Sequence, residues 1–218
     1  MTRSVASSTT LNRILLVVLA LATVVGFAVV PLETSLPVHW NLAGEADAFA
    51  PAAVALLLPA LMAGLVMFIL FLTRRFAPED YKSGRHVIDA VVTVITLLAI
   101  ILLAATIALG LGHAIEMPRL LAIAIGAMWL VVGNYLPKTQ SNAVAGVRLP
   151  WTMRDAGNWR VTHRWTGRLM MLAGAMVLLV ALANPAPEML FSTLALAVVG
   201  PVLASVVISY GLSRRSRG

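Results

Sequence analysis

The chain has 218 residues, of which 60% are hydrophobic and only 11% charged, and its formal net charge is +7. A soluble domain carries about 25% charged residues, so this composition cannot cover a water-exposed surface and predicts a protein of the lipid bilayer. Because the sequence contains no cysteine, disulfides and thiolate metal sites are excluded. Membrane topology explains the basic surplus, so direct binding to nucleic acid is not required.

Long apolar segments follow one another along the chain, and each is close to or above the ~17–25 residues that cross a bilayer as a helix. They lack the alternation of membrane-barrel strands. The predicted fold class is therefore all-α, a polytopic membrane protein with six transmembrane helices. The first segment is longer than a signal-peptide core and no clear cleavage site follows it, so we expect it to be retained. The segments are 14–32, 50–72, 90–112, 120–136, 169–187 and 189–212.

Basic residues are distributed unevenly between the loops. Of the 16 lysines and arginines, all but Arg119 lie before the first span, between spans two and three, between spans four and five, or after span six. Lysine and arginine concentrate in cytoplasmic loops. Both termini and the polar stretch between spans four and five are therefore predicted to be cytoplasmic.

The first external loop, LPVHWNLAGEADAFAP (residues 36–51), is rich in polar and turn-forming residues. Its histidine and two carboxylates could ligate a metal, but a closed zinc site needs four ligands and a catalytic site needs three plus water. We therefore expect no metal and no cofactor. The loop is either a structured turn anchored by its tryptophan at the interface or a contact surface for an external ligand. The residues concerned are His39, Trp40, Asn41, Gly44, Glu45 and Asp47.

The cytoplasmic stretch GVRLPWTMRDAGNWRVTHRW (residues 146–165) concentrates arginine and tryptophan in an otherwise apolar chain. Thr152 resembles a helix N-cap, with Asp155 as the acid of the first turn. A helix is predicted to run from about Met153 straight into the fifth span.

Arginines recur every four residues on that predicted helix, at Arg160, Arg164 and Arg168, and form a basic stripe suited to anionic head groups. Trp159 and His163 lie on a different face. Lipid anchoring explains the arginines and tryptophans most easily, and we expect His163 to make a structural hydrogen bond.

The sequence lacks the motifs of several enzyme and transporter classes. It contains no phosphate-binding GxxxxGK[ST] and no GxSxG, and the middles of the spans have no charged residues, which disfavours ion-coupled transport. A membrane enzyme or transporter that acts on a lipid or small molecule through His163, or through the pair His39 and Asp47, stays an alternative.

The two polar loops together resemble the SdpI family of bacterial toxin-immunity membrane proteins. LPVHWNLAGEADAF is similar to the pattern Pro-x-His-Trp-Asn-x-x-Gly-x-x-Asp of a small N-terminal domain of unknown function found in many such proteins. GNYLPKT and GVRLPWTMRDAGNWRVTHR resemble the family's runs Gly-Asn-x-x-Pro-Lys, Gly-Ile-Arg-Thr-Pro-Trp-Thr and Trp-x-x-Thr-His. Leu149 departs from the family's threonine, which removes a hydroxyl just before Pro150. The resemblance divides the chain into a two-helix unit, 1–86, and a four-helix SdpI-like unit, 87–218.

The resemblance implies a non-enzymatic protein of the bacterial plasma membrane that gives immunity to a secreted peptide toxin. It also implies a signalling role, in which a cytoplasmic transcriptional repressor is held at the membrane. The expected partners are membrane lipids, the toxin and that repressor. The residues expected to meet the toxin are His39, Trp40, Asn41, Gly44 and Asp47. The residues expected to meet the repressor or to set the switch are Asn134, Lys138, Gly146, Arg148, Pro150, Trp151, Thr152, Trp159, Thr162 and His163.

Overall fold

The computed structural model describes residues 3–215 of the chain. Within that range six helices are long and apolar enough to cross a membrane, which confirms the predicted fold class. These helices are α1 (Arg3–Val29), α3 (Leu57–Phe76), α4 (Pro78–Gly110), α5 (Met117–Tyr135), α7 (Ala156–Leu182) and α8 (Pro187–Arg215). The shorter elements are β1 (Ser35–Trp40), β2 (Ala46–Pro51), α2 (Ala52–Ala55), the 3-10 helix η1 (Leu136–Lys138) and α6 (Pro150–Arg154). Arg217 of the expected basic tail lies outside the described residues.

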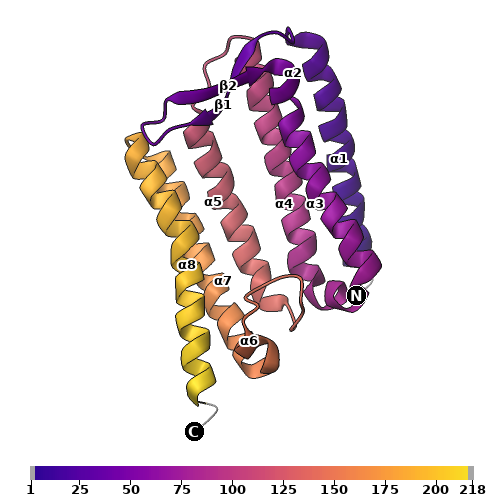
Figure 1. Cartoon of the computed structure of the whole chain (residues 1–218), viewed down its shortest axis with the longest axis vertical. Helices are drawn as coiled ribbons and strands as arrows, with labels where there is room; N and C mark the ends of the chain where they lie inside the picture. Colours follow the sequence, from indigo (N-terminus) through magenta and orange to yellow (C-terminus); the bar gives the residue numbers. More distant parts are fainter. Residues whose placement is uncertain (1–2, 216–218) are drawn as a thin grey trace.

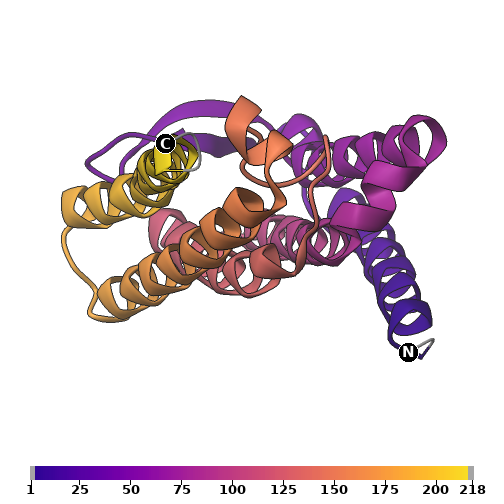
Figure 2. The same ribbon diagram turned by 90° about the horizontal axis from the view of Figure 1, so that it is seen from below.

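The long helices form two groups on either side of α4 and α5. Viewed from one end, α7 and α8 lie on one side and α1 and α3 on the other (Figure 2). One apolar core surrounds Leu103 of α4, and another surrounds Val177 of α7. The start of α1, the end of α8 and the short α6 lie toward one end of the bundle, which we term the α6 end (Figure 1). Strands β1 and β2 lie at the opposite end, which we term the hairpin end.

Helix α4 begins before the apolar run 90–112 that predicted the third span. Pro78 occupies the first turn, where its missing N–H costs no hydrogen bond, and Glu79 and Asp80 place negative charge at the positive end of the helix dipole. The polar stretch 78–89 therefore continues the helix beyond its apolar part. Because α4 is continuous across residues 86 and 87, the proposed boundary between two units falls inside a helix, and that division stays a prediction.

The loop 36–51, which we predicted to be external, folds as an antiparallel β-hairpin. The pairing runs from Ser35 opposite Pro51 to Trp40 opposite Ala46, with irregular register around His39. We predicted a turn here and missed the strands. Pro37 argues against a strand in the first segment, because proline cannot donate a ladder hydrogen bond. The alanine-rich stretch 46–51 lacks the β-branched residues that usually mark a strand. Pairing the two strands gives backbone N–H and C=O groups partners within the loop.

Helices α5 and α7 approach each other closely at two glycine pairs. A Cβ atom added to Gly133 would lie 2.6 Å from the backbone oxygen of Gly167, and one added to Gly126 would lie 3.0 Å from that of Gly174. Small residues allow such close backbone contact in membrane helices. The contact of Gly133 with Gly167 holds the C-terminal end of α5 against the first half of α7, where the candidate site begins.

Replacing Gly167 with alanine is expected to destabilise the protein by about 1–3 kcal/mol, because overpacking forces packed groups apart. The new Cβ would lie 2.5 Å from the oxygen of Gly133 and 2.9 Å from Pro137. Gly64→Ala is the matched control, since no heavy atom lies within 4 Å of its added Cβ. Thermal unfolding in detergent measures both variants, and equal stability of the two would contradict the close contact.

Candidate functional site

Helix α7 begins at a separate N-cap and not as a continuation from Met153, so that prediction was wrong. Residues 150–154 form the short helix α6. Asp155 separates α6 from α7, because its backbone is extended at φ −131° and ψ 108°. The Asp155 carboxylate accepts hydrogen bonds from the N–H groups of Gly157 (2.7 Å) and Asn158 (3.2 Å). Asp155 is therefore the N-cap of α7, because an acidic side chain satisfies the free amides of a first turn.

Thr152 forms hydrogen bonds with the backbone of residues 147 and 149, just before α6, and does not cap α7. Its fully buried hydroxyl accepts a hydrogen bond from the N–H of Leu149 at 2.9 Å and lies 2.7 Å from the carbonyl oxygen of Val147. The contact at residue 149 uses the backbone. The departure from the family's threonine at that position therefore leaves this contact intact.

His163 makes the structural hydrogen bonds that we expected. The N–H of Val147 donates to His163 Nε2 at 2.9 Å, and His163 Nδ1 lies 2.8 Å from the carbonyl oxygen of Trp159. Since an N–H only donates and a carbonyl only accepts, the proton of this neutral ring is on Nδ1. The side chain is fully buried. The imidazole thus joins the first turns of α7 to the loop that precedes α6.

Gly146 lies against the Nε2 edge of that imidazole. Its φ is +115°, a conformation that favours glycine. A Cβ atom at this position would also overlap His163 Nε2. Glycine is therefore required here both by its backbone conformation and by the close approach of the ring.

Trp159 belongs to the protein interior, so its assignment to lipid anchoring was wrong. The indole is 1% exposed, its Nε1–H donates to the carbonyl of Thr139 at 3.0 Å, and its ring stacks on His163 with 3.9 Å between centroids. Arg160, Arg164 and Arg168 are exposed, which confirms the predicted basic stripe on a different face of the helix.

Two polar side chains connect this segment to α8. The amide of Asn158 donates to the carbonyl of Ser209 at 2.8 Å and accepts from the hydroxyl of Thr162 at 2.9 Å. The indole N–H of Trp151 donates to the Ser209 hydroxyl at 2.9 Å, and its ring meets Tyr210 edge-on. Sequence reasoning missed Asn158 and Ser209.

Asn142 organises the loop after η1 and was also missed. Its side-chain oxygen accepts from the N–H groups of Val144 (2.9 Å) and Ala145 (2.7 Å), and its nitrogen donates to the carbonyl of Gln140 (2.8 Å). An Asx turn of this kind is the usual role of asparagine in a loop, so the residue type was the available signal. Asp80 of α4 accepts the N–H of Ala143 at 2.8 Å.

Four of the predicted inner residues lie at the edge of this arrangement. Asn134 is exposed, and the exposed Lys138 places its ammonium 4.1 Å from the ring centroid of Tyr135. The exposed Arg148 donates to the carbonyl of Ala143, and Pro150 begins α6. We name the hydrogen-bonded cluster itself the inner cluster. Its members are Gly146, Val147, Trp151, Thr152, Asn158, Trp159, Thr162, His163 and Ser209.

We name His39, Trp40, Asn41, Gly44 and Asp47 the outer motif, and they lie at or near the tip of the hairpin. His39 and Asp47 pair across the strands with 2.6 Å between Nδ1 and Oδ1, and both are exposed. The side-chain oxygen of Asn41 accepts from the N–H groups of Ala43 and Glu45, each at 3.0 Å. Within residues 3–215 no group of three metal-ligating side chains gathers here or elsewhere. The partly buried Trp40 lines a hollow of about 280 Å³ beneath the hairpin.

Gly44 brings the hairpin tip against the start of α8. Its φ is +78°, and a Cβ atom there would lie 2.9 Å from the Pro187 ring. Helix α8 therefore touches the outer motif at Pro187 and the inner cluster at Ser209, which lie at opposite ends of the bundle (Figure 1).

Comparison with known proteins assigns both regions. Residues 138–213 match the SdpI/YfhL protein family, and residues 14–63 match a domain of unknown function, DUF1648. The SdpI/YfhL match contains the whole inner cluster, and the DUF1648 match contains the hairpin.

A curated relative supports the same assignment. The immunity protein SdpI of Bacillus subtilis (strain 168) is 21% identical over 147 residues, which cover 67% of this chain and 69% of that protein. No solved structure matches the chain. With six helices long and apolar enough to span a membrane and a match to the SdpI/YfhL family, the chain is a multi-pass plasma-membrane protein.

Proposed function

We propose that this chain is a non-enzymatic membrane immunity protein that protects a bacterium against a secreted peptide toxin. The observation that carries the proposal is the match to the SdpI/YfhL family, whose matched residues include the complete inner cluster. The relative's designation as an immunity protein supplies the function. The hairpin supports it, because its His39–Asp47 pair is exposed at one end of the molecule.

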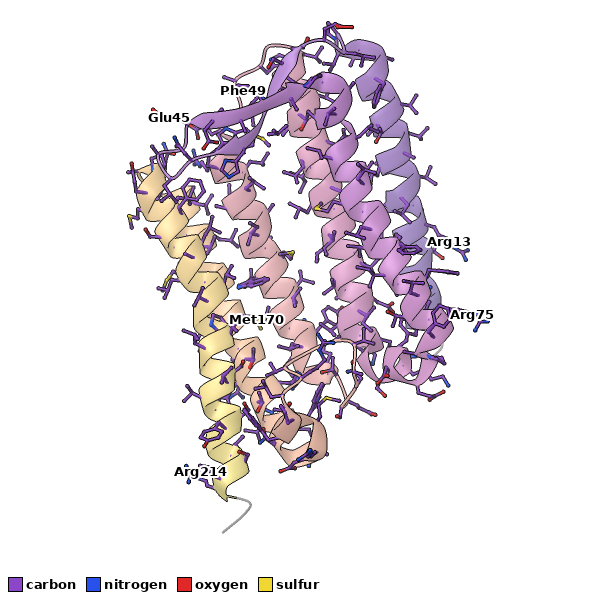
Figure 3. The ribbon with its side chains drawn as sticks, viewed as in Figure 1. Arg13, Glu45, Phe49, Arg75, Met170 and Arg214 are labelled. Atoms are coloured by element: carbon purple, nitrogen blue, oxygen red, sulfur yellow. The ribbon has the colours of Figure 1, made fainter. Side chains whose placement is uncertain are left out.

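The proposed orientation places the α6 end in the cytoplasm and the hairpin outside. Arg75 and Arg214 lie toward the α6 end and Glu45 lies at the hairpin end (Figure 3). This distribution agrees with the preference of basic residues for the cytoplasmic side. In that orientation His39, Trp40, Asn41, Gly44 and Asp47 would meet the toxin, and the inner cluster would face the cytoplasm.

Helix α8 supplies a physical route between the two ends. A toxin that binds one arrangement of the hairpin and α8 more tightly would shift the population toward that arrangement. Because Asn158 and Trp151 bind Ser209, movement of α8 would reach the inner cluster. A cytoplasmic repressor that binds one arrangement of this cluster would then be held at the membrane, with Asn134, Lys138 and Arg148 exposed beside it.

The contacts of the histidines weigh against the enzyme alternative. A general base must reach the proton that it removes, whereas His163 is fully buried and both of its ring nitrogens are hydrogen-bonded to the protein. His39 and Asp47 are exposed, but a catalytic zinc site needs three protein ligands, and Glu45 lies beside Asn41 instead.

Survival of a toxin-sensitive host tests the proposal. The chain would be expressed in a Bacillus subtilis strain that lacks its own SdpI, and survival would be measured against the concentration of secreted peptide toxin. We expect cells with the chain to survive at least tenfold more toxin than cells with an empty vector. Failure to protect against any related toxin, with the protein present in the membrane, would reject the immunity function.

A further inference from the structure

An apolar cavity of about 570 Å³ separates the two groups of helices. Its walls include Ile69 of α3, Val91 of α4, Trp129 of α5, Met170 of α7 and Val202 of α8. Helices α3 and α8 stand on opposite sides of it, with α4 and α5 between them (Figure 2). The volume lies within the roughly 300–1,000 Å³ of small-molecule pockets. Because most of the walls belong to membrane-spanning helices, the occupant would come from the bilayer.

The cavity contains one polar group that the protein leaves unsatisfied. Thr166 is 5% exposed, lines the cavity, and its hydroxyl has no hydrogen-bond partner within the described part of the chain. A helical threonine can bond to the carbonyl four residues earlier, as Thr96 does to Val92 at 2.8 Å. An unpaired buried hydroxyl is costly, so a ligand with a hydrogen-bond acceptor at this position would be favoured.

The α6 end of the cavity is basic. Arg148 lines it there, next to the backbone of Val147 and Leu149. The guanidinium has five N–H donors, and its contact with the carbonyl of Ala143 uses only one of its nitrogens. Thr166 follows His163, which binds Val147, by about one turn of α7. A single elongated ligand could therefore place an anionic group at Arg148 and, about one helical turn deeper in the cavity, an acceptor for the hydroxyl of Thr166.

The height of the cavity matches part of one leaflet of a bilayer. The lining spans residues 66–73 of α3 and 198–206 of α8, which at ~1.5 Å per residue is a height of about 10–12 Å. The height fits within one leaflet of a bilayer whose hydrocarbon core is about 30 Å thick.

We propose that the cavity binds an anionic phospholipid from the leaflet at the α6 end. An acyl chain lies between α3 and α8, an ester carbonyl accepts the hydrogen bond of Thr166, and the phosphate meets Arg148. Basic pockets between membrane helices on the cytoplasmic side recognise anionic head groups in this way. Residues 144–149 line the cavity, and Val147 among them donates its N–H to His163, so the bound lipid supports the inner cluster. This site does not depend on the immunity function.

Native mass spectrometry of the full-length protein, incubated with equal amounts of phosphatidylglycerol and phosphatidylcholine, tests the site. The first lipid adduct on the wild type is expected to be phosphatidylglycerol, in several-fold excess over phosphatidylcholine. Arg148→Gln should remove this preference, and Thr166→Val should reduce the adduct several-fold. Val202→Phe should abolish it by filling the cavity.

Two control variants separate the site from lipid bound on the outer surface. Val207 lies on the same helix as Val202 but outside the lining, and Arg164 is an exposed arginine of the basic stripe. Val207→Phe and Arg164→Gln should therefore keep the wild-type adduct. Equal binding of the two lipids, or an unchanged adduct in Val202→Phe, would overturn the proposal. The proposal would also be overturned if the wild type carried a peptide or a second copy of the chain at this site instead of lipid, and if Val202→Phe removed it.

Discussion

Replacing Gly146 with alanine is expected to destabilise the protein by at least about 2 kcal/mol. Backbone in a sparsely populated φ region costs about 1–3 kcal/mol for a residue with a side chain, and Gly146 has φ +115°. The new Cβ would also push against His163 Nε2. Displacement of the imidazole would break the hydrogen bond that His163 accepts from Val147, and an unpaired buried group costs about 1–3 kcal/mol more.

Thermal unfolding in detergent measures this effect, with Gly211→Ala as the control. Gly211 lies on α8 near the same end of the bundle, and no heavy atom lies within 4 Å of a Cβ added there. Because alanine is a better helix former than glycine by about 1 kcal/mol, the control should be as stable as the wild type or slightly more stable. If Gly146→Ala unfolds at the same temperature as Gly211→Ala, the contact with His163 is wrong.

Replacing His163 with phenylalanine is expected to cost about 2–5 kcal/mol. Phenylalanine can keep the stacking on Trp159 and fill most of the volume, but it neither accepts from the N–H of Val147 nor donates to the carbonyl of Trp159. The N–H of Val147, left without an acceptor, costs about 1–3 kcal/mol, and the lost side-chain hydrogen bond to Trp159 costs about 0.5–1.5 kcal/mol more. The loop 139–149 is expected to loosen first, which limited proteolysis would detect as faster cleavage.

His86→Phe is the matched control, since His86 is exposed on α4. An exposed substitution of this kind changes stability by about 0.5 kcal/mol or less. Should His163→Phe prove as stable and as resistant to protease as His86→Phe, the ring would not have the structural role assigned to it. A catalytic role would then need to be reconsidered.

The spans were predictable from the sequence because hydropathy alone defines them. Lipid provides no hydrogen-bond partners, so an apolar run of sufficient length has helix as its available form. The ends of the helices were less predictable. Helix α4 extends to Pro78 through polar residues, where proline and acidic residues decide the start and hydropathy gives no signal.

The candidate site was predictable in outline only. The motif residues Gly146, Thr152 and His163 do meet in the inner cluster, as their resemblance to a family pattern suggested. Asn158 and Ser209 were not predictable, because their contact joins residues 51 positions apart and depends on how α7 packs against α8. The break at Asp155 follows from its capping hydrogen bonds, which compete with continuation of the helix.

The structural role of the outer motif was predicted from the sequence only in part: the turn was expected, whereas the strands were not. His39 and Asp47 pair across two strands, and Asn41 and Gly44 form the turn between them. The same residues were predicted as a toxin contact, and that role stays a prediction. The contact of Gly44 with Pro187 adds a link to α8 that the spacing of the motif does not reveal.

The central claim is that the hairpin and α8 act together in immunity, and survival of the toxin-sensitive strain that expresses Gly44→Val tests it most directly. Gly112→Val is the control, because Gly112 has a similar φ of +85° near the same end but no heavy atom within 4 Å of its added Cβ. We expect Gly112→Val to protect as the wild type does and Gly44→Val to lose at least tenfold in tolerated toxin, with both proteins present in the membrane in equal amounts. Equal protection by the two variants would contradict the claim.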